Sequence, residues 1–458
     1  MNSLGKCIYD WLNAENKTIA QLAEIAGYRS KTSIFRLLHG KSNYSSCLQF
    51  YDAVRPSLDE KWQKRFQYAL LSEKVGETRH LLMDALDQCL FHASAGPLSL
   101  REHPDNPGVP SSAGEVYIIG CPWADTFCKL DQWVSVSDQI QVIHYVKRRD
   151  IDQSPDLLAG LISQITRMQY DAVMLEEADN NQELQMTWNL ALWIHEKQAW
   201  ILLAGSQHTN WHSLPGGSAE AKSFLSGISH FRQTPLYRCS DLGNGMDYIS
   251  FTEQNYRMER NRKALIIKPC PGMQMLPAGI VERTFKDFLE ENLEPISAAR
   301  ETLIYTFEKR VSNFYHSSKH EFLILSRESM LQFARTGLLA DHFFAFRPFT
   351  KEERIQIIRA LSDLSKKETV SILFTEDETW PVSVEAYDGY GVLFYPSDTN
   401  YNTSLSDYRE LFLPGQDCSD LMFQYAEEYC FRNDNAENGR KADEFFSVLL
   451  NKAAGAIE

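Results

Sequence analysis

The segment from Thr18 to Lys41 constrains this 458-residue chain most strongly, because its pattern predicts two short helices joined by a tight turn. Thr18 and Gln21 have the spacing of a capping box, which marks the start of the first helix. Gly27 supplies the positive φ angle that the turn needs, and Gly40 ends the second helix just before Lys41. Any model of the fold therefore has to contain this helix pair.

The first 93 residues as a whole are predicted to be helical. Leu4, Ile8, Trp11 and Leu12 recur at the spacing of one apolar helix face. Two further pairs fit the capping box and predict helix starts, Ser46 with Gln49 and Ser57 with Glu60. Segment 94–114 contains four Pro, three Gly and four Ser, a composition typical of a linker. We therefore predict a helical domain over 1–93 and a linker over 94–114.

Charge is distributed unevenly along the chain. The formal net charge is −15, which disfavours nucleic-acid binding if it is spread evenly. Residues 1–93 hold 12 Lys and Arg against 10 Asp and Glu, a net of +2, and the remainder holds 34 against 51, a net of −17. Between Lys17 and Lys41 there are five basic residues and one acid, Glu24. Because charges beyond about 8 Å are screened at physiological salt, this local balance permits contact with phosphate.

Residues 4–55 resemble the helix-turn-helix of the lambda-repressor-like, or Xre-type, regulators. The resemblance includes Ala23, which is small where the two helices approach, and the glycines Gly27 and Gly40. It implies a small core with Leu22, Ala26, Ile34 and Leu37 on the two helices and Leu48, Tyr51 and Val54 on the next one. In this family the second helix lies in the major groove, and flanking groups bind phosphate.

The resemblance also implies a DNA-binding surface on the second helix and just after it. Carried over by position, its residues are Ser30, Lys31, Thr32, Phe35, Arg36, Lys41 and Asn43. Ser30 would cap the helix, and Lys31, Thr32 and Phe35 would face the groove. Arg36 would reach a base edge or the backbone, and Lys41 and Asn43 would touch phosphate. Phe35, at a position that is usually polar, would contact a thymine methyl or pack against another domain. The implied partner is double-stranded DNA, bound by a homodimer.

Beyond residue 114 strand and helix patterns alternate, which favours a mixed sheet region. The predicted strands are Val116–Ile119, Ile140–Val146, Ala172–Leu175, Trp200–Ala204, Ala264–Ile267, Glu321–Leu325, Thr369–Phe374, Val382–Ala386 and Val392–Tyr395, the last three as an antiparallel meander. The predicted helices are Leu157–Tyr170, Ala219–Phe231, Val281–Leu293, Ala298–Tyr315, one that ends at Gly337, one capped by Thr350 and Glu353, and a tail from Ser419.

These signals place an α/β domain over 115–295 and an α+β domain over 296–458, and they also fit one larger unit. No internal repeat is evident in the sequence. The predicted fold class is therefore multidomain, with an N-terminal all-α helix-turn-helix domain followed by an α/β or α+β C-terminal region.

No motif in the sequence nominates an active site. Gly-rich phosphate loops and a nucleophile elbow are absent, so we predict no catalytic residue, no cofactor and no metal site. The chain is not expected to be an enzyme, although an enzyme within 115–458 stays open. Nine Cys without a CxxC pair, and no apolar run that could cross a bilayer, predict a cytoplasmic protein without a membrane partner. The basic cluster Arg257–Lys263 indicates a solvated turn, or a site for an acidic partner or ligand.

Together these features predict a DNA-binding transcription regulator. Its large C-terminal region would sense a small-molecule or protein effector, or assemble the protein. The alternative is a helical protein-interaction scaffold that does not bind DNA.

Overall fold

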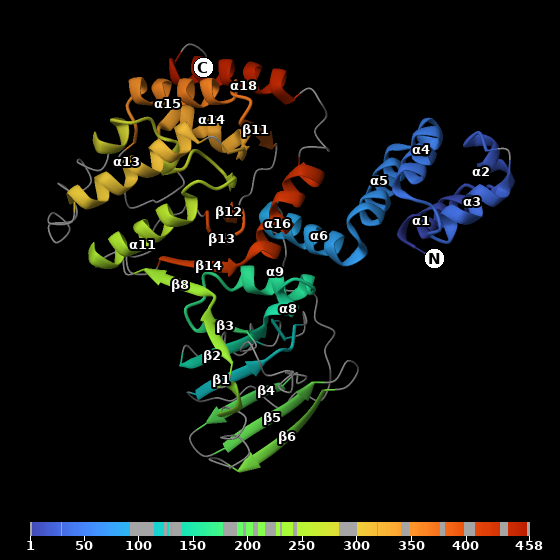
Figure 1. The fold of residues 1–458 in the computed structure, drawn as a ribbon, viewed down its shortest axis with the longest axis horizontal. Helices are drawn as coiled ribbons and strands as arrows, with labels where there is room; N and C mark the ends of the chain where they lie inside the picture. The colour runs from blue at the N-terminus through green and yellow to red at the C-terminus, as the bar shows by residue number, and fades with distance from the viewer. Residues whose placement is uncertain are drawn as a thin grey trace. The chain divides into compact units, whose positions relative to one another are not determined.

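A computed structural model describes residues 2–28, 30–91, 114–122, 126–127, 130, 139–176, 190–195, 198–204, 209–215, 226–229, 231–240, 245–283, 300–317, 319–339, 348–375, 381–397, 408–430 and 438–455. The chain forms two compact units, Met1–Asp84 (unit 1) and Ala85–Glu458 (unit 2). The N-terminal region is helical and the remainder contains mixed α/β sheets (Figure 1), which confirms this order as predicted from sequence.

Unit 1 is built from helices alone in the part of it that the structure describes. They are α1 (Ser3–Ala14), α2 (Ile19–Ile25), α3 (Lys31–Leu38), α4 (Tyr44–Val54), the short 3-10 helix η1 (Arg55–Ser57), α5 (Glu60–Val75) and α6 (Glu77–Phe91), which continues into unit 2. One apolar core joins α1 to α5, with Trp11 and Phe66 in edge-to-face contact at its centre. Burial of such rings supplies much of the stability of a small helical bundle.

The starts of these helices confirm one predicted capping box and correct two. Thr18 and Gln21 cap each other at the start of α2. The N-cap of α4 is Asn43 rather than Ser46, and the N-cap of α5 is Asp59 rather than Ser57. Asn and Asp are among the strongest capping residues, so each helix begins at the better cap.

The core face of α4 also differs from the expectation. Leu48 is 40% exposed, whereas Cys47, Phe50, Tyr51 and Val54 are buried. These four positions follow the i, i+3, i+4, i+7 spacing of a single helix face. The sequence-based choice of Leu48 missed this face by one residue.

Unit 2 contains two sheets of seven strands each. The first has the order β6-β5-β4-β1-β2-β3-β7, with β1 (Gly114–Ile119), β2 (Ile140–Lys147), β3 (Tyr170–Glu176), β4 (Leu190–His195), β5 (Gln198–Ala204), β6 (Thr209–Pro215) and β7 (Arg232–Pro235). The second has the order β11-β10-β9-β12-β13-β14-β8, with β8 (Tyr237–Ser240), β9 (Ala264–Lys268), β10 (Glu321–Ser326), β11 (Val370–Thr375), β12 (Val382–Tyr387), β13 (Gly391–Pro396) and β14 (Tyr408–Pro414).

Six strands of each sheet repeat one topology, and the seventh, β7 or β8, is placed differently. In the first, β1, β2 and β3 are parallel neighbours, and β4, β5 and β6 continue from β1 as an antiparallel meander. In the second, β9, β10 and β11 are parallel neighbours, and β12, β13 and β14 continue from β9 in the same way. Unit 2 therefore contains a structural repeat that the sequence analysis did not find.

The chain passes from one sheet to the other at Leu236. This residue separates β7, which pairs with β3, from β8, which pairs with β14. Its amide donates to the carbonyl of Ala172 in the first sheet at 2.8 Å, and its carbonyl accepts from the amide of Phe412 in the second at 2.7 Å. One residue thus hydrogen-bonds to both sheets and holds their edges together.

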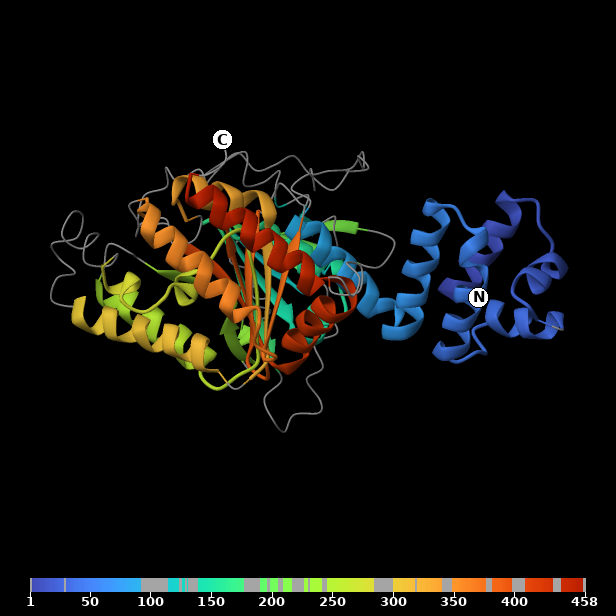
Figure 2. The same cartoon turned by 90° about the horizontal axis from the view of Figure 1, so that it is seen from above.

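Helices cover the second sheet on the side of its parallel strands. The helices and helical turns of unit 2 are α8 (Arg148–Ile151), α9 (Pro155–Ser163), α11 (Gly245–Glu259), η2 (Met273–Met275), α13 (Arg300–His316), α14 (Arg327–Thr336), α15 (Lys351–Leu364), α16 (Gln416–Tyr425), η5 (Ala426–Cys430) and α18 (Asn438–Ala453). One apolar core joins α13, α14, α15 and α18 to β9, β10 and β11, and Figure 2 shows α13, α15 and α18 together beside the strands. All residues of β9 and β10 are buried, so both faces of these strands are covered.

All strands predicted from sequence are present, but the end of one helix and the pairing of one strand were wrong. The helix predicted over Leu157–Tyr170 ends at Ser163, because Tyr170 begins β3 beside Val142. The strand Val370–Thr375 pairs in parallel with β10 and is not part of a meander. In the described residues, no helix combines the length and apolar character needed to span a bilayer. The predicted linker 94–114, except Gly114, and the predicted boundary near 296 lie outside the described residues.

Arg409 on β14 ties the second sheet to the first. Its guanidinium donates to the carbonyl oxygens of Arg167 and Tyr170 and, at 2.7 Å, to Asp171 Oδ1. It also lies 4.0 Å from the ring centroid of Tyr237. Arg409 is 2% exposed, so water cannot replace it at these acceptors.

Arg409→Ala is expected to lower the free energy of unfolding by about 2–4 kcal/mol, because it removes a buried guanidinium that donates to the carbonyl oxygens of Arg167 and Tyr170 and to Asp171. Urea denaturation of the full chain measures the change. Arg359→Ala, at an exposed position on α15, is the control and should shift the free energy by less than about 0.5 kcal/mol. Equal shifts in the two variants would contradict the role assigned to Arg409.

Candidate functional site

A glycine ends α2 and sets the turn toward α3. Gly27 has a φ of 69° in the left-handed region, and its amide donates to the carbonyl of Glu24 at 3.0 Å. The amide of Tyr28 donates to the carbonyl of Ala23 at 2.7 Å. This pair of bonds is a Schellman motif, which satisfies the last carbonyls of a helix. The ring of Tyr28 stacks on Phe50 of α4 with centroids 6.4 Å apart, so packing also fixes the path of the chain after α2.

A second glycine ends α3 in the same way. Gly40 has a φ of 65°, and its amide donates to the carbonyl of Leu37 at 3.1 Å. The amide of Lys41 donates to the carbonyl of Arg36 at 2.8 Å, and Arg36 Nη2 donates back to the carbonyl of Lys41 at 3.4 Å. The last turn of α3 and the segment after it are therefore held in one conformation.

The inner face of α3 packs against α1. Ile34, Leu37 and Leu38 are buried. A Cβ at Gly5 of α1 would lie 2.2 Å from the carbonyl oxygen of Leu38, so only glycine permits this approach. Because one face of α3 is fixed against the core, the opposite face points outward.

The residues predicted to bind DNA lie on this outward face or just beyond its ends. Within the described structure all seven are exposed: Ser30, Lys31, Thr32, Phe35, Arg36, Lys41 and Asn43. Ser30 Oγ accepts from the amide of Thr32 at 3.0 Å, which confirms it as the cap of α3. Asn43 Oδ1 accepts from the amide of Ser46 at 2.9 Å, so this side chain has a capping role at α4 that the sequence did not indicate. Contact of these residues with DNA stays a prediction.

The charge on this surface is not neutralised locally. None of the ion pairs found among the described residues of unit 1 involves Lys31, Arg36 or Lys41. Neither α3 nor α4 has an acidic residue in its first turn. The amino ends of both helices therefore keep their partial positive charge, which favours an anion.

Phe35 differs from its neighbours on this surface. Its side chain is 45% exposed although it is aromatic. A single exposed apolar residue is common in proteins, but here it lies on the same helix face as Lys31 and Thr32. It can contact an apolar group on whatever covers this face.

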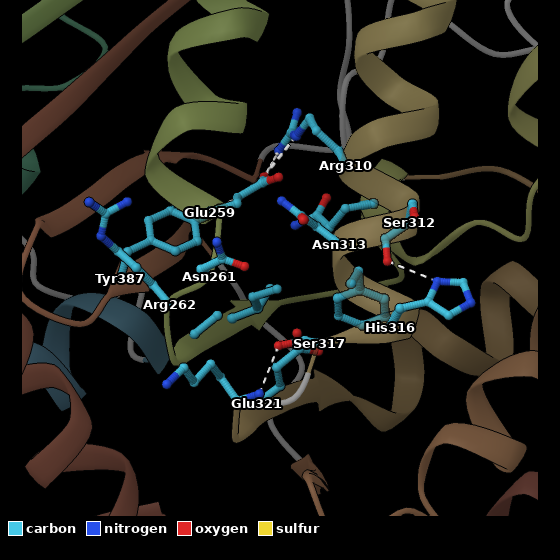
Figure 3. Close-up of a pocket in the computed structure, with 15 residues that line it drawn as sticks. Glu259, Asn261, Arg262, Arg310, Ser312, Asn313, His316, Ser317, Glu321 and Tyr387 are labelled. Carbon is cyan, nitrogen blue, oxygen red and sulfur yellow. Dashed lines mark hydrogen bonds and ion pairs between the residues drawn. The ribbon is translucent and has the colours of Figure 1, made fainter.

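A second candidate site is a cavity of about 190 Å³ in unit 2. It lies at the amino-terminal ends of β9 and β10, between α11 and α13, and Figure 3 shows the labelled side chains around it. Its wall includes Glu259, Gln274, Arg310, Asn313, Glu321 and Tyr387. Most of these side chains are polar, so the cavity suits a polar occupant.

A buried ionic network lies behind this wall, with Glu385 of β12 at its centre. Lys268 Nζ lies 2.6 Å from Glu385 Oε1, and Tyr387 donates to Oε2 at 2.5 Å. Arg310 donates to Glu259 and lies 3.9 Å from Glu385 Oε2. Burial acts to raise the pKa of Glu385, but Lys268 and Arg310 outweigh it and hold that pKa below its usual range.

The sequence analysis did not single out this network. Lys268 ends an otherwise apolar strand, and Glu385 lies within a strand that is buried throughout. A charged residue inside an apolar strand implies a buried partner of opposite charge, so the sequence of these two strands could have indicated the network. The basic cluster Arg257–Lys263 falls beside the cavity, where Arg262 donates to the carbonyl oxygens of Arg257 and Met258.

Comparisons with known proteins assign no family. No protein-family model matches the sequence, and a search of curated proteins gave no match. Among solved structures, a polyphosphate kinase from Porphyromonas gingivalis aligns over 82% of this chain and 53% of its own, with 10% identity and a TM-score of 0.20. This chain thus spans about half the length of that protein, and so low a TM-score supports no conclusion about fold or activity.

Asn43→Ala is expected to lower the free energy of unfolding by about 1 kcal/mol, because the first turn of α4 loses the acceptor for its amide. The measurement is denaturation of the full chain followed by circular dichroism. Lys41→Ala, two residues earlier and exposed, should change the free energy by less than about 0.5 kcal/mol. If both variants lose the same stability, Asn43 does not act as a cap.

Proposed function

We propose that this protein is a DNA-binding transcription regulator that inserts α3 into the major groove of double-stranded DNA. The observation that carries the proposal is the surface formed by the outward face of α3 and the residues just beyond its ends, where all seven residues that the resemblance assigns to DNA binding are exposed. A helix that reads base edges needs such a face, and it needs the opposite face to be packed on a rigid support. The contacts of α3 with α1 and the two glycine ends supply that support.

Three groups of contacts are proposed on this surface. Lys31 and Thr32, in the first turn of α3, face base edges. Arg36, held at the carbonyl of Lys41, keeps most of its donors free for a base or a phosphate. Lys41 and the first turn of α4 bind phosphate, since an uncompensated helix start and a lysine act together there.

Unit 2 is proposed to sense an effector or to assemble the protein. A single small helix pair covers few base pairs, and regulators with such domains bind paired half-sites as dimers. We therefore propose a homodimer. The cavity at the amino-terminal ends of β9 and β10 supports a sensing role, because it offers polar side chains in a concave space.

The double variant Lys31→Ala/Arg36→Ala is expected to weaken binding to random-sequence duplex DNA. It should also reduce the slope of log K against log salt by about 1 for each phosphate contact that is lost. Fluorescence anisotropy titrations at several salt concentrations measure both quantities.

The control is Lys61→Ala/Lys64→Ala, which removes the same charge from exposed positions on α5. It should leave affinity and slope close to wild type. A wild-type affinity independent of salt, or equal losses in the two double variants, would rule out binding through α3.

A protein-interaction scaffold is the second candidate, and the exposure of Phe35 favours it. On that account the aromatic ring contacts a protein partner or a second copy of the chain. Phe35→Ser would then dissociate the homodimer in sedimentation velocity, and the wild type would not bind DNA. The regulator account expects the dimer to persist in Phe35→Ser, because the ring faces DNA and not the other copy.

A further inference from the structure

In the cavity between α11 and α13, more hydrogen-bond acceptors than donors lack a partner. Gln274 Oε1 and Glu321 Oε2 are buried and have no hydrogen-bond partner among the described residues. Glu259 on the same wall accepts from Arg310 and Tyr387 through Oε1. Among the buried atoms that line the cavity, the two acceptors of Gln274 and Glu321 stand against one unpaired donor, Asn313 Nδ2.

Burial makes these unpaired atoms significant. Gln274 is 2% exposed and Glu321 is 4% exposed, and both line the cavity. A buried polar atom without a partner costs free energy, and such atoms are uncommon in folded proteins. Two of them directed into one cavity indicate that something with donors occupies it.

Among the buried residues of the wall the charges favour a cation as that occupant, whereas the less buried Arg262 and Lys319 add positive charge at the rim. In the buried network Lys268 and Arg310 balance Glu259 and Glu385. Glu321 is a further acid, and none of the ion pairs between described residues includes it. Among the buried unpaired atoms of the wall acceptors outnumber donors, so the occupant needs at least two N–H groups directed at them.

We propose that this cavity binds a small organic cation, with an ammonium or guanidinium group directed at Glu321, Glu259 and Gln274. The volume of about 190 Å³ corresponds to roughly six waters at ~30 Å³ each. Because bonded atoms pack more closely than separate waters, the ligand has at most about a dozen non-hydrogen atoms. Exposed Lys319 and His316 at the rim also suit a ligand that carries a carboxylate at its other end. The proposal does not rest on DNA binding by α3.

Binding of a cation has a consequence for the protonation of Glu321. Burial, with a smaller contribution from Glu259, raises the pKa of Glu321 to about 8. The charged and titratable groups around it are Glu259 on α11, Arg310 and His316 on α13, Lys319 and His320 in the preceding turn, and Lys367 after α15. At pH 7 a carboxyl with a pKa near 8 is about nine-tenths protonated, and a bound cation favours the ionised form. Binding is therefore expected to release close to one proton.

The test is isothermal titration calorimetry of the full chain with agmatine, arginine and putrescine at pH 7. Citrulline is the matched control, because it replaces the guanidinium of arginine by a neutral urea. At least one cation should bind about 10-fold or more tightly than citrulline, and titration in two buffers of different ionisation enthalpy should show proton release. Binding of arginine alone identifies a zwitterion as the ligand class, and binding of agmatine or putrescine identifies a simple cation.

Glu321→Gln preserves the shape of the side chain and removes its charge. It should weaken cation binding about 10-fold or more and abolish the proton release. Glu308→Gln, an exposed change on α13 that does not line the cavity, should leave both unchanged. Wild-type protein that binds no cation above citrulline, or binds one without releasing a proton, would overturn the proposal and leave a cavity filled by water only. Neither result depends on whether the chain binds DNA.

Discussion

Helices α2 and α3 of unit 1 each end at a glycine, and these two helix ends determine which face of α3 is exposed. Gly27 and Gly40 adopt left-handed φ angles, and each places two amides on the last carbonyls of the preceding helix. A residue with a Cβ is strained in this conformation, so the path of the chain before and after α3 depends on glycine. Together with the close approach at Gly5, these ends leave α3 one orientation, with its apolar face inward. The proposed function depends on that orientation.

Unit 2 has a different constraint, since its two sheets, which repeat one topology in six of their seven strands, meet at Leu236. The hydrogen bonds of this residue and the buried guanidinium of Arg409 hold the sheets together. The cavity and the buried network of Glu385 occur in the second sheet. The cavity and this network are the structural reason to assign a specific role to the second sheet.

The sequence predicted the parts of the fold that depend on local chemistry. Thr18 and Thr350 form capping boxes, Gly27 and Gly337 take left-handed angles, and the apolar strands form, because neighbouring residues alone determine these features. The pairing of strands depends on residues far apart in the sequence, and so the parallel partner of β11 and the repeat of the sheets were not predicted.

The same distinction holds for the sites. The residues proposed to bind DNA lie within 14 positions of one another, from Ser30 to Asn43, and could be named from sequence. The cavity residues Glu259, Gln274, Arg310 and Glu321 come from separate elements, so no local pattern could bring them together. The N-cap prediction was wrong where two capping residues lie close together, because α4 and α5 begin at Asn43 and Asp59 and not at Ser46 and Ser57.

The most direct test of the account is amide hydrogen exchange of the full chain with and without duplex DNA. The account predicts slower exchange on DNA binding in α3 and in the first turn of α4, residues 30–46, because their amides and side chains lie against the groove and phosphates. Unchanged exchange over these residues, with protection elsewhere or nowhere, would contradict it.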